Sequence, residues 1–212
     1  MKVAIITEDA GQFRAFPRLY GQLNAAAQES QLLRPLKVSV SPEAPVEAIA
    51  NACAPKIVIA RQLNARVIVL LLDRERRAEC SGLLAVRLTD GIRRRIDLSG
   101  LALHVVMKDR TFENWLIADV NALEAQPARF NVTPAIRQAV SSHNADGRDA
   151  LALLKAAAIR RAYDKVEDAD RICARQDIMR VGAGSRSFRH LLHVLGVAPY
   201  RDQCRSPSRS TS

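Results

Sequence analysis

The sequence predicts an α/β protein in which a parallel β-sheet is flanked by helices, with a helical extension at the C-terminal end. Short apolar runs rich in β-branched residues recur along the first half of the chain, and segments of helical spacing separate them. Strands that alternate with helices are typical of βαβ units, whose strands run parallel. The last third shows helical spacing and little strand signal. We therefore expect an α/β domain over 1–130, a helical C-terminal extension over 131–200 and a disordered basic tail over 201–212.

The first half of the chain accounts for the predicted sheet. The expected strands are residues 2–8, 36–41, 66–72 and 101–108. The run at 66–72 is short, continuous and β-branched, which is typical of a strand buried on both faces. The expected helices are residues 12–28, 46–64, 76–95 and 111–126. Pro17 and Pro55 should start, kink or break the helices in which they lie, and Thr111 is a candidate N-cap.

The second half of the chain is predicted to be helical from 134 to 195. The stretch "DGRDALALLKAAAIRRAYDKV" has the composition of a strong helix, and "SFRHLLHVLG" predicts another that stops at Gly196. The whole chain is strongly basic. Its net charge is +10 and its pI is about 10.1, which suits a polyanionic partner such as nucleic acid.

Two classes of protein are disfavoured by composition. No apolar run approaches the roughly 20 residues of a membrane helix, and the N-terminal apolar run is followed at once by acids, as in a first strand rather than a signal peptide. The four cysteines lie far apart and form no CxxC pair, so no zinc site or redox pair is indicated. Reduced thiols in a cytoplasm are the simplest explanation.

Acidic residues follow the predicted strands. Glu8 comes after the first strand, Asp73 and Glu75 follow the strand at 66–72, and Glu113 begins the helix after the strand at 101–108. The carboxyl ends of parallel strands meet at one edge, and residues i and i+2 of an extended segment point the same way. Clustered carboxylates repel one another, and Mg²⁺ or Mn²⁺ would relieve this repulsion. Solvated loop acids are the alternative.

Basic residues near these acids suggest contacts with phosphate. Arg74, Arg76 and Arg77 follow the strand at 66–72, and with the arginines at 93–95 they predict salt-sensitive binding of nucleic acid. Arg186 lies in "GAGSRSF", where glycines and serines would suit either a phosphate-binding turn or a simple helix N-cap by Ser185 or Ser187.

The order of these motifs resembles a Toprim domain, the catalytic module of topoisomerases, primases and the overcoming-lysogenization-defect nucleases. More specifically, "VIVLLLDRE", "FENWLIAD", "YDKVEDADRI" and "SRSFRHLLHVL" resemble a Toprim-like family encoded beside ABC-type ATPases in bacterial phage-defence loci. The resemblance implies that Glu8, Asp73, Glu75 and Glu113 bind the metal and take part in catalysis. It also implies that Lys165 or Arg186 supplies positive charge to the transition state, and a solvated charge on a helix face is the alternative for Lys165.

The function expected from this resemblance is metal-dependent cleavage of phosphodiester bonds in DNA or RNA, by an effector of an ATPase-linked anti-phage system. A non-catalytic or inhibited subunit that binds an ABC-type ATPase is the alternative. A nucleotide-binding regulator ranks third, because neither a G-x-G-x-x-G motif nor a Walker lysine is present. The choice between DNA, tRNA and other RNA stays open.

Overall fold

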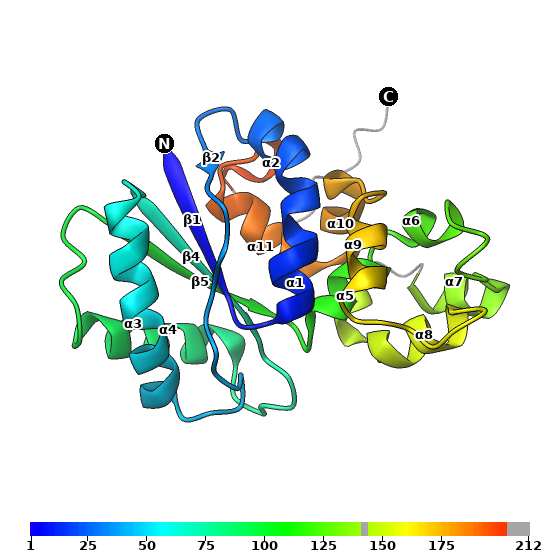
Figure 1. Ribbon diagram of the computed structural model, residues 1–212, viewed down its shortest axis with the longest axis horizontal. Helices are drawn as coiled ribbons and strands as arrows, with labels where there is room; N and C mark the ends of the chain where they lie inside the picture. The colour runs from blue at the N-terminus through cyan, green and yellow to red at the C-terminus, as the bar shows by residue number, and fades with distance from the viewer. Residues whose placement is uncertain (141–143, 203–212) are drawn as a thin grey trace.

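The computed structural model describes residues 1–140 and 144–202, so most of the predicted disordered tail lies outside it. A five-stranded parallel sheet lies at the centre with helices on both faces (Figure 1), which confirms the predicted fold class. The strand order is β2-β1-β4-β5, and β3 also pairs with β1. The strands are β1 (Lys2–Thr7), β2 (Gln31–Leu32), β3 (Leu36–Lys37), β4 (Val67–Asp73) and β5 (Ala102–Lys108).

Helices fill most of the remaining described sequence. The α-helices are α1 (Ala10–Ala15), α2 (Tyr20–Ala26), α3 (Val46–Gln62), α4 (Ser81–Arg93), α5 (Phe112–Ile117), α6 (Val120–Glu124), α7 (Pro134–Val140), α8 (Ala150–Ala157), α9 (Glu167–Cys173), α10 (Ile178–Gly184) and α11 (Arg186–Val194). Short 3₁₀ turns are η1 (Phe16–Leu19), η2 (Ala145–Gly147) and η3 (Ala198–Tyr200). No helix in the described ranges is long and apolar enough to cross a bilayer.

Prolines affect two of the predicted helices differently. The helix expected at 12–28 is interrupted by η1, which has Pro17 at its start. The helix containing Pro55, in contrast, is continuous, so the predicted break is wrong. Proline removes one backbone hydrogen bond, but the buried face of α3 packs on the sheet and holds the helix together on both sides of Pro55.

Three other predicted elements were too long. The strand expected at 36–41 is reduced to β3, and the helix expected at 111–126 is divided into α5 and α6. The helix expected at 76–95 begins only at Ser81. Arg77 explains this late start, because its side chain donates hydrogen bonds to the carbonyls of Pro42 and Ala44 and holds the preceding loop against another segment.

The long helix expected around "DALALLKAAAIRRAYDKV" is also wrong beyond Ala157. The chain turns into an extended conformation at Ala158, which forms an antiparallel bridge with Phe130. Arg160 then has a φ of 68°, a left-handed conformation that no helix continues. Backbone pairing with the segment near Phe130 therefore replaces the last two predicted turns.

Side chains of β1 and β4 alternate between two hydrophobic clusters, one on each face of the sheet. One cluster contains Ala4, Ile68 and Leu70, and α3 and α4 cover it. The other contains Val3, Val69 and Leu71 and is completed by helices from the rest of the chain; in Figure 1, α6, α7 and α8 lie farther from the strands than α1 and α11 do. Residues on both sides of the predicted domain boundary at 130 contribute to this second cluster.

Candidate functional site at the carboxyl edge of the sheet

Three neighbouring strands bring charged residues to one edge of the sheet. Glu8 follows β1, Asp73 is the last residue of β4, and Lys108 is the last residue of β5. Asp73 and Lys108 lie opposite each other in the parallel register of β4 and β5. The apolar strands bury this edge deeply, so the charged groups must satisfy one another.

The buried ammonium of Lys108 lies between oxygen atoms. Its Nζ is 2.6 Å from Asp73 Oδ1 and 3.6 Å from Glu8 Oε1, and it donates a 2.6 Å hydrogen bond to Gln12 Oε1. The side chains of Lys108, Glu8 and Asp73 are 0%, 4% and 9% exposed. Glu8 Oε1 also accepts a 2.7 Å hydrogen bond from the backbone N–H of Asp73. This arrangement is a compact, nearly dry ion-pair network.

Burial dominates the electrostatics of this network. It raises the pKa of Asp73 to about 7, although the charge of Lys108 opposes the shift. Burial alone would lower the pKa of Lys108, but Asp73 and Glu8 outweigh it and raise that pKa to about 12. Lys108 is therefore a cation at neutral pH, and burial and the charge of Lys108 act on the pKa of Asp73 in opposite directions.

The other two predicted acids lie apart from this pair. β4 ends at Asp73, and Glu75 has a φ of 53°, so the extended geometry that would align Asp73 with Glu75 does not continue. Glu75 lines a groove instead, where burial raises its pKa. Glu113 is buried in the first turn of α5, and its Oε1 lies 3.5 Å from Nζ of Lys165, a lysine that is 55% exposed. Each buried acid near the edge thus has a lysine beside it.

The four acids do not fit a divalent ion in this arrangement. Among the described residues, no group of three or more His, Cys, Asp or Glu side chains lies so as to hold a metal. A cation bridging Glu8 and Asp73 would meet the ammonium of Lys108, which already compensates them. The expected site for Mg²⁺ or Mn²⁺ therefore stays a prediction that requires Lys108 to move.

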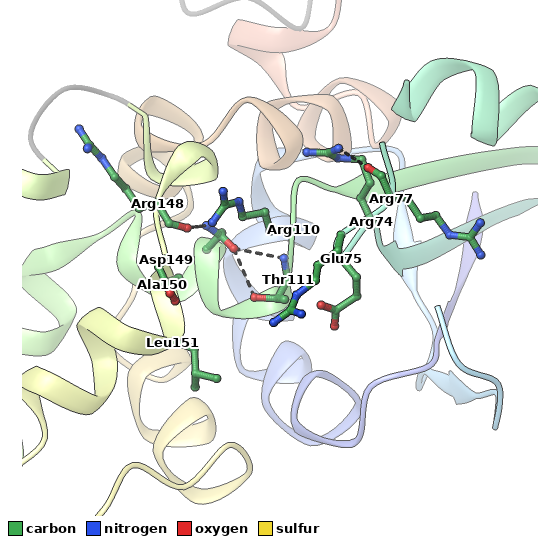
Figure 2. A pocket seen from close by; sticks show the side chains of 11 residues that line it. Arg74, Glu75, Arg77, Arg110, Thr111, Arg148, Asp149, Ala150 and Leu151 are labelled. Carbon is green, nitrogen blue, oxygen red and sulfur yellow. Dashed lines mark hydrogen bonds between the residues drawn. The ribbon is translucent and has the colours of Figure 1, made fainter. Parts of the chain in front are cut away.

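An arginine-lined groove of about 510 Å³ lies beside the acidic edge (Figure 2). One wall is the loop after β4, and the opposite wall is the segment leading into α8. The arginines in its lining are Arg74, Arg76, Arg77, Arg110 and Arg148. The groove brings the three arginines predicted after β4 together with two that the sequence did not single out.

The arginines of this groove have different roles. Arg74 forms an ion pair with Asp109 at 2.5 Å, and Arg77 binds backbone carbonyls, so both support the loop after β4. Arg76 is exposed. The arginines at 93–95, which were expected on the same face, lie at the far end of α4, where Arg94 and Arg95 pair with Glu47. The predicted continuous basic face is therefore divided.

Arg186 lies in a second pocket and not in the groove. The phosphate-binding turn considered for this segment is already filled by a carboxylate. Asp146 Oδ2 accepts from the backbone N–H of Ser187 at 2.9 Å, and its Oδ1 accepts from the hydroxyl of Ser185 at 2.7 Å. Ser185 is the N-cap of α11, as the alternative predicted. The structure therefore favours the capping role.

Sequence reasoning missed Lys108, Gln12 and Arg110. The signal for Lys108 was a lysine that ends an apolar strand next to the strand ending in Asp73, a juxtaposition visible only once the strand order is known. Thr111 was correctly predicted as an N-cap, and its N–H donates to Asn114 Oδ1. Trp115 is in the core at 1% exposure.

These features define a parallel α/β protein with a buried charge network and an arginine groove at the carboxyl edge of its sheet. The model of the family described as Domain of unknown function (DUF4276) matches residues 4–196, so the chain belongs to that family. No curated protein and no solved structure matches the chain.

Proposed function

We propose that the chain is a nuclease, which cleaves phosphodiester bonds of DNA or RNA as the effector of an ATPase-linked anti-phage defence system in the cytoplasm. The observation that supports the proposal is the adjacency of the arginine groove to the edge that carries Asp73 and Lys108. Two short loops link them: Arg74 pairs with Asp109, and the N–H of Glu75 donates to the carbonyl of Arg110. Arginines suit the phosphate backbone, which every nucleic acid presents.

The residues of this edge suit phosphoryl transfer. A carboxyl whose pKa is about 7, as for Asp73, can accept or donate a proton at neutral pH. The exposed ammonium of Lys165 can neutralise charge that develops on the phosphate. Dependence on Mg²⁺ or Mn²⁺ is part of the prediction to be tested, and no step is assigned to the ion.

The test is a cleavage assay on DNA and on total tRNA, with and without an ABC-type ATPase of the class that the resemblance implies, in Mg²⁺, in Mn²⁺ and in EDTA. Asp73→Asn should abolish cleavage, because it removes the group that exchanges a proton. Asp170→Asn is the matched control, because Asp170 forms a surface ion pair with Arg18 far along the chain from the groove. Cleavage that persists in Asp73→Asn at the wild-type rate would refute the proposal.

A second candidate is an inhibited or non-catalytic subunit that binds an ABC-type ATPase. The pairing of Lys108 with both inner carboxylates favours it, because this pairing compensates the charges that a catalytic cation would use. Wild-type chain that binds nucleic acid and the ATPase but leaves every substrate intact would favour this candidate.

A further inference from the structure

Lys108 Nζ lies at a position where oxygen atoms converge. The ammonium contacts Asp73 Oδ1, Gln12 Oε1 and Glu8 Oε1, which are oxygens from the end of β4, from α1 and from the segment that joins β1 to α1. Hard divalent cations in proteins select such oxygen sets. A fully buried lysine in such a position acts as a counter-ion supplied by the chain itself.

The network contains one more indication of a cation position. Glu8 Oε2 is buried and accepts no hydrogen bond within the described part of the chain. A buried carboxylate oxygen without a donor is costly, so this atom retains capacity for a positive partner. Lys108 Nζ lies 2.6 Å from Asp73 Oδ1 and from Gln12 Oε1 but 3.6 Å from Glu8 Oε1, so it compensates Glu8 less closely than Asp73.

We propose that Lys108 takes the place of a divalent cation between Glu8 and Asp73, so that this pair binds Mg²⁺ or Mn²⁺ only when the Lys108 ammonium is removed or displaced. A divalent ion and an ammonium at the same carboxylates repel each other, and the ammonium cannot diffuse away. Lys108 therefore determines the cation specificity of the edge. In its bearing on catalysis the inference rests on the proposed nuclease function, whereas its test needs neither nucleic acid nor turnover.

The decisive variant is Lys108→Met, which keeps an unbranched side chain of nearly the same length and removes its charge. Mn²⁺ binding is measured by calorimetry, and the thermal unfolding midpoint is followed by the fluorescence of Trp115, the single tryptophan. In EDTA the variant should unfold at a lower temperature than the wild type, because Glu8 and Asp73 then repel each other. Mn²⁺ should raise its midpoint and leave that of the wild type unchanged.

Two further variants separate this inference from a general effect of charge. Lys165→Met removes an exposed lysine from Glu113 and should gain no Mn²⁺ binding. Asp73→Asn combined with Lys108→Met should lose the Mn²⁺ response, because one carboxylate ligand is absent. Calorimetry should give a dissociation constant for Lys108→Met at least about tenfold lower than for the wild type.

The wild type also supplies a result that would overturn the inference. Stoichiometric Mn²⁺ binding by the wild type, lost in Asp73→Asn, would show that the ion and Lys108 coexist. If Lys108→Met is unfolded in EDTA, refolding in Mn²⁺ or Mg²⁺ supports the inference, and failure of both ions to refold it contradicts it. A nuclease that cleaves without a metal would leave these binding outcomes unchanged, so the two proposals fail separately.

Discussion

The ion pair between Arg129 and Asp168 offers the clearest test of how the C-terminal helices are held. Asp168 is fully buried, and its carboxylate accepts hydrogen bonds from Arg129 Nε at 2.9 Å and Nη2 at 2.6 Å. It also accepts from the backbone N–H of Asp164 at 2.8 Å. Asp168→Asn removes the charge with little change of shape, and it leaves the mostly buried Arg129 without its anion.

The expected loss follows from what remains of the network. Breaking a buried pair costs about 3–5 kcal/mol. Arg129 keeps hydrogen bonds to the carbonyls of Ile159, Arg161 and Ala162, so the lower end, about 3 kcal/mol, is expected. In a chain of this length, such a loss lowers the unfolding midpoint by roughly 6–12 °C.

The pH dependence of the unfolding free energy tests the same ion pair independently. Burial would raise the pKa of Asp168, but hydrogen bonds from Arg129 and Asp164 outweigh it and hold the pKa below its ordinary value. The stabilisation is therefore fully present above about pH 4, the pKa of an unfolded aspartate, and is lost as the pH falls through the folded-state pKa. In Asp168→Asn this part of the acid dependence should be absent.

The assay is urea unfolding followed by Trp115 fluorescence, repeated over a range of acidic pH. Asp170→Asn is the matched control, because Asp170 lies on the same helix and pairs with the exposed Arg18, a contact worth about 0–1 kcal/mol. Equal losses in Asp168→Asn and Asp170→Asn, or an unchanged acid dependence in Asp168→Asn, would refute the reasoning.

Three further predictions concern a close backbone contact, the groove and the start of α11. Gly11→Ala should destabilise by about 1–3 kcal/mol, because the added Cβ would come within 2.3 Å of the carbonyl oxygen of Lys165; urea unfolding measures this. Arg76→Gln should reduce the salt dependence of nucleic-acid binding by about one phosphate contact, seen as a shallower plot of log affinity against log salt. Asp146→Asn should cost about 1–3 kcal/mol, because its carboxylate accepts from the N-terminus of α11; thermal unfolding measures the loss.

Each of these predictions has a control in the same chain. Gly21→Ala adds a Cβ with no neighbour within 4 Å inside α2 and should stabilise by about 0.5–1 kcal/mol. Arg93→Gln, at the far end of α4, should leave the salt dependence unchanged. Asp149→Asn alters the N-cap of α8 and should cost less than Asp146→Asn, because asparagine caps helices about as well as aspartate. A larger effect in any control than in its partner would contradict the corresponding prediction.

The fold could be predicted from the sequence where a hydrophobic pattern is compatible with only one kind of element. The continuous apolar run of β4 required burial on both faces, and the helices on the two faces of the sheet supply it. The prediction that Glu8 and Asp73 lie at the carboxyl edge of the sheet was also correct. The partner of these acids was not predicted, because a lysine at the end of a strand is equally compatible with solvent until the register places Lys108 opposite Asp73. Contrary to the prediction, Glu75 does not point the same way as Asp73, because Glu75 has a positive φ that the sequence "DRE" does not reveal.

The two faces of the sheet are completed by different lengths of chain. The cluster under α3 and α4 draws its fully buried members from between Ala4 and Met107, whereas the opposite cluster extends to Tyr200. During synthesis the first face can close about one hundred residues before the second has all its helices. Until then β4 presents Val69 and Leu71 without their final cover, so a chain shortened to the first 130 residues would expose an apolar sheet face and should aggregate.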